Sequence, residues 1–224
     1  MLRDKRIRFI VGHYGSGKTE FSVNYAIKLA KLGKKVALAD LDVVNLYFRS
    51  REKTELLGKL GIKVIGSGIE APAVDVPSIS PDIVTPMQDT SYEAIIDVGG
   101  DPAGARTLGR YKEYIVDGDY DMFFVLNANR PETQTVEKAM EYLRRIEDTA
   151  RAKVTGIVNN THMLKSTTTI DVLRGQELAL ELSRKVNIPV RYISTIDRVA
   201  KELPDNLEGK IFPMTLYMRD EWMV

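Results

Sequence analysis

The chain has 224 residues, 44% of them hydrophobic, which is enough to build one α/β domain with a sizeable core. Its 32 Lys and Arg nearly balance its 31 Asp and Glu, so a net charge of +1 gives no global reason to bind nucleic acid or an anionic membrane. The absence of Cys excludes disulfides and thiolate metal sites, and without a signal-peptide pattern or an apolar run of about 18 residues we expect a cytoplasmic protein with no membrane span.

Short apolar runs alternate with amphipathic stretches along most of the chain. The apolar runs are continuous, which is typical of strands buried on both faces of a parallel sheet. In chain order the sequence predicts strand 7–12, helix 18–32, strand 35–40, helix 51–61, strand 62–65, strand 93–100 running into a glycine-rich turn, strand 120–128, helix 132–147, strand 153–160, helix 170–187 and strand 188–194.

This order predicts a three-layer α/β/α fold, doubly wound, with a mostly parallel sheet. Residues 66–90 are rich in Pro, Ser and Asp, and we expect a long surface excursion there with one helical turn near residues 81–87. The tail, residues 211–224, is expected to pack on the body or on another subunit. No interior linker interrupts the pattern, so residues 1–224 are treated as a single domain.

The stretch GHYGSGKT, residues 12–19, lies between the first predicted strand and the first predicted helix. It fits the pattern G-x-x-x-x-G-K-[ST], whose glycines let the backbone curl so that N–H groups point inward at phosphate. In such a loop Lys18 reaches the β- and γ-phosphates of a nucleotide, and the Thr19 hydroxyl binds Mg²⁺. An ordinary glycine-rich turn is the alternative, and it accounts less well for the full pattern in this context. The residues assigned to nucleotide binding are Gly12, Gly15, Ser16, Gly17, Lys18, Thr19 and Glu20.

Acidic residues stand at the ends of two other predicted strands. Asp40 and Asp42 follow the second strand, and Asp97 ends the strand in IIDVGGD, shortly before Gly100. Because ligands bind beyond the carboxyl ends of strands in a doubly wound sheet, these carboxylates can meet the glycine-rich loop there. The alternative is that they only cap strands and form turns.

The chain resembles the MinD/ParA and CobQ/CobB superfamily of P-loop ATPases in three stretches: GHYGSGKT, DLDVVN and DVGGDPAG. The resemblance covers most of the chain, from about Ile7 to Ser194, and it implies a site for ATP and Mg²⁺ on a parallel sheet of seven or eight strands. The roles that it implies are catalysis for Lys18 and Asp42, with Asp42 positioning the attacking water, the water shell of the metal for Asp40 and Asp97, and detection of the γ-phosphate for Gly100.

The stretch GIVNN, residues 156–160, resembles the strand end at which an Asn reads the nucleotide base in this superfamily. By its spacing from Gly156, Asn160 is the better candidate and Asn159 is its neighbour. The guanine-reading pattern N-K-x-D is absent, since NNTH stands in this place, so ATP is favoured over GTP. The alternative is an Asn that merely caps the next turn.

The second position of the glycine-rich loop departs from the resemblance. Members of the superfamily usually have a Lys there that reaches across a dimer and stabilises charge in the transition state, whereas this chain has His13. An unperturbed His is mostly neutral at pH 7, but the negative charge of bound polyphosphate would favour its protonated form. Two interpretations stay open: His13 donates charge in catalysis, or only its backbone contacts phosphate.

Three functions fit these features. The preferred one is a slow, Mg²⁺-dependent ATPase that acts as a nucleotide-driven switch on a partner protein, because residues 44–52 and 101–114 are placed as switch loops after Asp42 and Asp97. The second is a small-molecule ATP-dependent ligase similar to dethiobiotin synthetase, and the third is a non-hydrolysing regulatory module. The sequence does not identify the partner protein. A homodimer, in which the partner is a second copy of the chain, also fits these features. Nucleic acid is not an expected partner.

Overall fold

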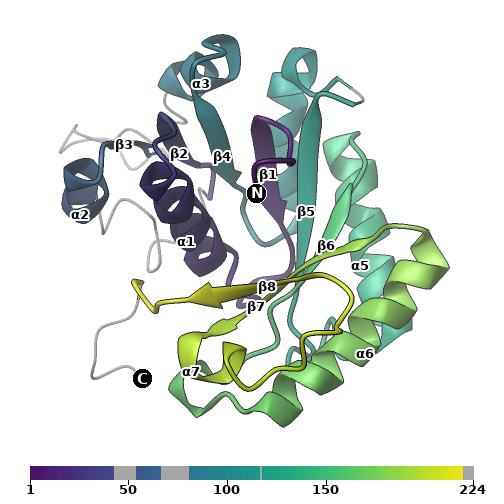
Figure 1. The fold of residues 1–224 in the computed structure, drawn as a ribbon. Helices are drawn as coiled ribbons and strands as arrows, with labels where there is room; N and C mark the ends of the chain where they lie inside the picture. Colours follow the sequence, from purple (N-terminus) through teal and green to yellow (C-terminus); the bar gives the residue numbers. More distant parts are fainter. Residues whose placement is uncertain (43–53, 67–80, 117, 219–224) are drawn as a thin grey trace, which may run out of the picture.

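The computed structural model describes residues 1–42, 54–66, 81–116 and 118–218. Within them, eight parallel strands form a single sheet in the order β3-β2-β4-β1-β5-β6-β7-β8 (Figure 1). The predicted parallel sheet is therefore confirmed. The strands are β1 (Ile7–Val11), β2 (Val36–Asp40), β3 (Ile62–Ile65), β4 (Glu93–Asp97), β5 (Tyr120–Leu126), β6 (Gly156–Asn159), β7 (Val190–Ile196) and β8 (Lys210–Met214).

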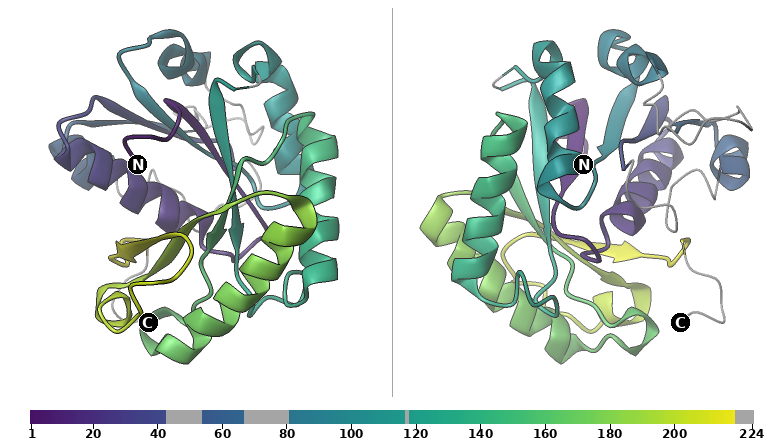
Figure 2. Two further views of the ribbon diagram at one scale, coloured as in Figure 1. Left: turned by 45° about the vertical axis from the view of Figure 1, so that its right-hand side comes forward. Right: turned by 180° about the vertical axis from the view of Figure 1, so that it is seen from behind.

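Helices cover both faces of this sheet, with α1 on one face and α5 and α6 on the other (Figure 2). The α-helices are α1 (Lys18–Lys31), α2 (Thr54–Lys59), α3 (Thr85–Gln88), α4 (Pro102–Arg106), α5 (Val136–Ala150), α6 (Thr169–Val186) and α7 (Asp197–Ala200), and the 3₁₀ helices are η2 (Pro81–Val84), η3 (Thr107–Tyr114) and η4 (Leu164–Ser166). Among the described residues, no helix has both the length and the apolar character needed to cross a membrane.

Two hydrophobic clusters lie on the two faces of the sheet, as the alternation of side chains along each strand requires. In β1, Phe9 belongs to the cluster that includes Leu143 of α5. Its neighbour Ile10 belongs to the opposite cluster, which includes Tyr25 of α1. Every residue of β1 is buried and all but Arg8 are apolar, and the strand lies in the interior of the sheet between β4 and β5.

The strand order reverses beside β1. Strands β2, β3 and β4 lie on one side of β1, and β5 to β8 lie on the other. In open parallel sheets this reversal leaves a crevice beyond the carboxyl ends of the strands, and ligands bind there. The loop that follows β1 is therefore placed at the ligand-binding position of the fold.

Some elements differ from the prediction. The strand β8 was not expected, because Pro213 interrupts a pattern that also lacks clear alternation; Pro is tolerated here because β8 is the edge strand of the sheet. The helix expected to begin at residue 132 begins at Val136, where the Thr135 hydroxyl caps it. The helical turn near residues 81–87 is confirmed, whereas residues 67–80 of the same excursion lie outside the described residues.

Candidate functional site

The loop 12–19 joins β1 to α1 in a tight curl. Gly12 and Gly17 have positive φ angles of 144° and 84°. A Cβ atom on Gly12 would lie 2.4 Å from the carbonyl oxygen of Val125, and one on Gly17 would lie 2.3 Å from Asn160 Nδ2. Only glycine fits these two positions, so the loop packs directly against the neighbouring strand ends and leads into the N-terminus of α1, and helix N-termini favour anions.

The Lys18 side chain folds back over this loop. Its Nζ donates a hydrogen bond to the carbonyl oxygen of His13 at 3.2 Å, and the residue is only 7% exposed. Burial lowers the pKa of Lys18, whereas the nearby Asp97, Asp42 and Asp101 act to raise it. The ammonium group of Lys18 is therefore already partly desolvated. A polyphosphate that binds to it causes little additional desolvation of this group.

Asp97 connects the loop to the end of β4. Its carboxylate accepts hydrogen bonds from Thr19 Oγ1 at 2.6 Å and from Ser22 Oγ at 3.3 Å. Burial raises the pKa of Asp97 to about 6, against the opposing effects of Lys18 and Thr19. Asp40, also buried, is the register partner of Asp97 on β2. A hydroxyl and two carboxylates at adjacent strand ends are oxygen donors of the kind that Mg²⁺ prefers, so this part of the site fits the metal.

The turn after β4 approaches the loop closely. A Cβ atom on Gly100 would lie 2.8 Å from Lys18 Nζ, and one on Gly99 would lie 3.4 Å from Asp42 Oδ1. Asp40 Oδ1 accepts a hydrogen bond from the backbone N–H of Asp42 at 2.9 Å, which fixes the chain where it leaves β2. The acidic residues predicted from two separate strand ends therefore meet Lys18 in one place.

A cavity of about 260 Å³ lies beside the loop. Its polar lining includes loop residues, Asp42, Arg130 and residues that follow β6, and its apolar lining comes mainly from chain segments at the ends of β7 and β8. This combination suits a ligand with a charged portion and a flat apolar portion. The aliphatic lining residues are Leu164, Ile196, Met214, Leu216 and Met218.

The two Asn residues at the carboxyl end of β6, Asn159 and Asn160, make contacts in different places. Asn160 lines the cavity, and its Nδ2 donates to the carbonyl oxygen of Ser16 at 2.7 Å. The Asn159 amide instead donates to the carbonyl oxygen of Val172 and to Gln176 Oε1, at 3.0 and 3.2 Å, which ties it to α6. Base reading by Asn160 stays a prediction that this geometry allows, whereas Asn159 supports the strand end from behind.

Glu20 has a role that the sequence did not indicate. Its carboxylate accepts hydrogen bonds from the backbone N–H groups of Tyr217 and Met218 at 2.6 and 3.1 Å. Asn24, one turn later in α1, donates to the carbonyl oxygen of Thr215 and accepts from its N–H, at 2.8 and 2.9 Å. We call residues 215–218 the strap, and it forms part of the cavity wall. No local pattern could have revealed contacts between residues so far apart in the chain.

The His13 side chain lies outside the cavity lining. Its Nε2 is 3.4 Å from Glu132 Oε2, and its ring meets the Tyr142 ring edge-on with centroids 5.1 Å apart. The Tyr142 hydroxyl donates to the carbonyl oxygen of Gly100 at 2.5 Å, so α5 links position 13 to the turn after β4. A charge-donating role for the imidazole stays a prediction, and in this arrangement His13 offers Lys18 its backbone carbonyl.

Arg130 is the residue that sequence reasoning missed and could have found. It follows the predicted strand 120–128 and so stands at the same edge of the sheet as Asp42 and Asp97. Its Nε donates to the carbonyl oxygen of Gly15 at 2.9 Å, and it lines the cavity. The first expected switch loop, residues 44–52, lies outside the described residues, whereas the second is α4 and η3.

Comparisons with known proteins agree with this architecture. The family model described as the CobQ/CobB/MinD/ParA nucleotide binding domain matches residues 10–199. No curated protein matches the sequence significantly.

Among solved structures, the cell division protein FtsY from Thermotoga maritima is 20% identical, with a TM-score of 0.54 over 84% of this chain and 61% of its own. The signal recognition particle receptor FtsY from Elizabethkingia anophelis, in complex with GDP, is 19% identical, with a TM-score of 0.56 over 86% of this chain and 58% of its own. This chain thus matches about three fifths of the length of these proteins, and at such identities the likeness shows the fold alone.

Proposed function

Because this chain belongs to the CobQ/CobB/MinD/ParA nucleotide-binding domain family, we propose that it binds ATP with Mg²⁺, hydrolyses it slowly and acts as a nucleotide-driven switch on a partner protein. The observation that carries the proposal is the convergence of the glycine-rich loop, the buried Lys18 and the Thr19–Asp97 pair on one cavity. These are the groups that phosphoryl-transfer sites of this type require.

Each residue has a part in this mechanism. Lys18 and the loop N–H groups bind the polyphosphate, and Thr19 would hold Mg²⁺ with help from Asp40 and Asp97. Mg²⁺, when bound, supplies charge neutralisation at the phosphate oxygens. Asp42 lies next to the Gly99–Gly100 turn, where it can orient a water molecule for attack. These roles are the ones that the family pattern implies for residues at these positions.

The switch function rests on the closeness of the Gly99–Gly100 turn to the loop. Gly100 abuts Lys18 and Tyr14, so a terminal phosphate bound by Lys18 must settle beside this turn. The turn continues directly into α4, whose first residue follows Asp101. Loss of the terminal phosphate on hydrolysis is therefore able to move α4. Nucleotide switches signal to partner proteins through movements of this kind.

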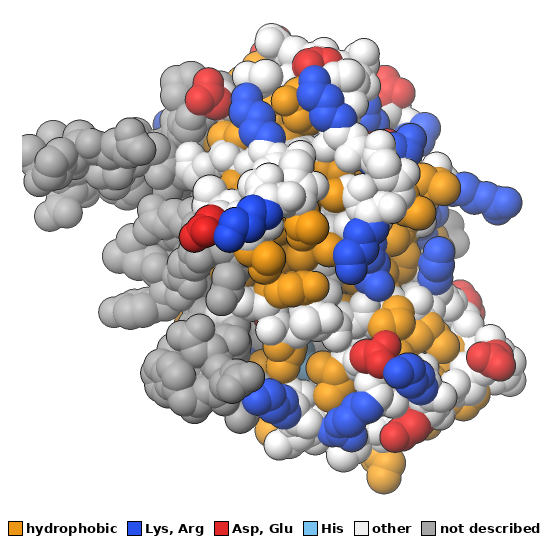
Figure 3. Space-filling view, turned by 60° about the vertical axis from the view of Figure 1, so that its left-hand side comes forward, with side chains coloured by type: hydrophobic (Ala, Val, Ile, Leu, Met, Phe, Trp, Pro, Cys, Tyr) orange, Lys and Arg blue, Asp and Glu red, His pale blue; other side chains and the backbone are white. Residues whose placement is uncertain are grey.

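ATP is favoured over GTP because residues 159–162, at the carboxyl end of β6, read NNTH rather than N-K-x-D. A protein partner, or a second copy of the chain, is favoured by two exposed large side chains: Tyr14, which lines the cavity, is 56% exposed, and Met163, which lies between the lining residues His162 and Leu164 in the sequence, is 55% exposed. On the face that Figure 3 shows, the Lys and Arg side chains of the described residues are interspersed with apolar and acidic ones, an arrangement that gives no support to a nucleic-acid partner.

The test combines binding, turnover and mass measurements on the full chain. We expect calorimetric titration to show Mg²⁺-dependent binding of ATP that is tighter than that of GTP, and Lys18→Ala to weaken ATP binding at least tenfold, about 1.4 kcal/mol. Slow phosphate release with an ATP-dependent mass change in light scattering supports the switch. Turnover only in the presence of an added carboxylate metabolite would support a ligase, and failure to bind any nucleotide would overturn the proposal.

A further inference from the structure

The position that carries a cation in most relatives of this loop contributes no side chain to the cavity here. The His13 imidazole is held outside by Glu132 and by the Tyr142 ring, and the cavity lining runs from Tyr14 onward. Polyphosphate carries several negative charges, of which Lys18, the loop N–H groups and the proposed Mg²⁺ neutralise a part. A second side-chain cation at the cavity would strengthen the binding of this charge.

Arg130 is placed to be that cation. It stands in a tight turn after β5, in which its N–H bonds to the carbonyl oxygen of Asn127 at 3.1 Å and its own carbonyl accepts from Thr133 at 2.9 Å. The Thr133 hydroxyl also donates to the carbonyl oxygen of Asn127, at 2.8 Å, so the turn is braced internally. A side chain on such a support loses little freedom when it binds a ligand.

The guanidinium group lies directly on the glycine-rich loop. Its Nε donates to the carbonyl oxygen of Gly15 at 2.9 Å. A Cβ atom on Gly15 would lie 2.8 Å from Arg130 Cζ and 2.9 Å from Nη2, so the guanidinium occupies the space that any side chain at position 15 would need. Gly15 has a φ of 72°, so glycine at this position both allows the tight turn of the loop and leaves space for the guanidinium group.

The rest of the guanidinium is available to a ligand. Within the described part of the chain, no carboxylate pairs with Arg130, and Nε makes the one side-chain hydrogen bond of this residue. Arg130 lines the cavity that Lys18 also lines, and its two terminal nitrogens have no hydrogen-bond partner among the described residues. A planar fork of this kind matches two oxygens of a phosphate group, which an ammonium group cannot do.

We propose that Arg130 is a phosphate-binding residue of this site, which contacts the polyphosphate of a bound nucleoside di- or triphosphate from within the same chain. This inference rests on the proposed function. Arg130 replaces the charge that position 13 does not supply, and its turn after β5 becomes part of the nucleotide site. Because Arg130 contacts both Gly15 and the bound phosphate in this proposal, ligand binding would also affect the packing between Gly15 and Arg130.

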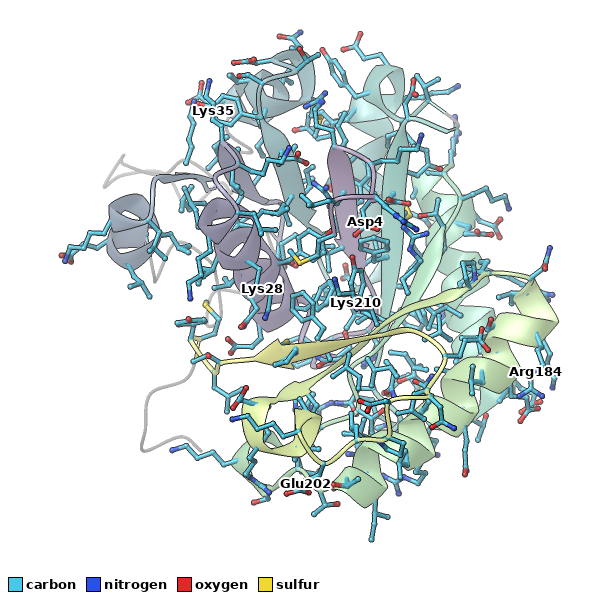
Figure 4. All side chains as sticks on the ribbon, viewed as in Figure 1. Asp4, Lys28, Lys35, Arg184, Glu202 and Lys210 are labelled. Atoms are coloured by element: carbon cyan, nitrogen blue, oxygen red, sulfur yellow. The ribbon has the colours of Figure 1, made fainter. Side chains whose placement is uncertain are left out.

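The experiment titrates ATP, ADP and adenosine into the parent and into Arg130→Ala, Arg130→Lys and Arg130→Gln, at two salt concentrations. The matched control is Arg184→Ala, which removes the same charge from the exposed last turn of α6, away from the cavity (Figure 4). We expect Arg130→Ala to weaken ATP binding about tenfold or more, to weaken adenosine binding little, and to reduce the salt dependence of ATP affinity.

The Lys and Gln variants separate charge from support of the loop. If the charge acts on phosphate, Arg130→Lys keeps more ATP affinity than Arg130→Gln, although Gln still has N–H donors for the carbonyl oxygen of Gly15. Equal losses in these two variants, or ATP affinity within twofold of the parent in Arg130→Ala, would overturn the inference while leaving the proposed function intact. A parent that binds no nucleotide would overturn the proposed function, and the inference with it.

Discussion

Asp42 is the residue on which the proposed chemistry depends most directly. It is fixed by the N–H···Oδ1 bond to Asp40 and lies next to the Gly99–Gly100 turn. If Asp42 orients water and does not bind phosphate, as proposed, Asp42→Asn should keep ATP affinity within a few-fold and lower turnover roughly 10²-fold or more. Calorimetry and single-turnover phosphate release measure the two effects separately. Hydrolysis at the parent rate would move this role to another residue, with Asp101 the next to test.

His13 allows a sharper test now that its surroundings are known. Since its imidazole contacts Glu132 and Tyr142 outside the cavity, we expect His13→Ala and His13→Lys to follow the parent's pH profile of turnover between pH 6 and 9. The backbone carbonyl that accepts from Lys18 is unchanged in both variants. Turnover at saturating ATP is the measurement. A rate that falls with rising pH in the parent, and is flattened by His13→Lys, would show that the imidazole enters the site as a cation.

At the scale of elements, the link between α1 and the strap joins the nucleotide loop to the far end of the described chain. Glu20 receives two N–H groups from the strap, and a carboxylate accepts such bonds more strongly than an amide. We expect Glu20→Gln to lower the free energy of unfolding by about 1–2 kcal/mol in urea titrations. Glu177→Gln makes the same chemical change on an exposed position of α6 and should have no measurable effect.

The same variant tests whether the strap belongs to the binding site. Leu216 and Met218 line the cavity, so a loosened strap should weaken ATP binding while leaving inorganic tripolyphosphate, which has no base, bound as before. Equal losses for both ligands would mean that Glu20 acts on the phosphate loop and not on the base. Unchanged stability and unchanged ATP affinity would show that the strap contacts do not matter in solution.

The strap and β8 also show where sequence reasoning ends. The loop, Asp97 and the continuous strands were predictable because each depends on a local pattern: a glycine spacing, a strand end or an apolar run. The strand β8 contains Pro213 and is a strand only because the edge of β7 is there to pair with it. The Tyr142–Gly100 and Glu20–Met218 bonds join residues that are distant in the chain, and no pattern within either segment specifies its partner.

At the scale of the whole molecule, Asp4 joins three parts of the fold around one carboxylate. Its side chain is 4% exposed and accepts hydrogen bonds from Tyr25 of α1 and from Tyr192 and Arg191 of β7, with Arg191 at 2.5 Å. Asp4, labelled in Figure 4, precedes β1, so these bonds tie the central strand to a helix and to a strand near the sheet edge. Burial acts to raise the pKa of Asp4, but these hydrogen bonds outweigh it and lower the pKa.

A carboxyl group whose pKa is lowered by folding stabilises the protein fully above its unfolded pKa of about 3.9, and this contribution is lost as the pH falls through the folded value. Asp4→Asn should therefore lower the free energy of unfolding at pH 7 by about 1.5–3 kcal/mol, because charge-assisted bonds are lost. The gap to the parent should narrow as the pH falls below about 4, because Asp4 then becomes protonated in the unfolded parent before it does in the folded parent. Urea titrations from pH 7 to pH 3, followed by circular dichroism, measure it, with Asp205→Asn as an exposed control. Equal stability at pH 7, or a gap that persists undiminished at pH 3, would show that the Asp4 contacts do not stabilise the fold in this way.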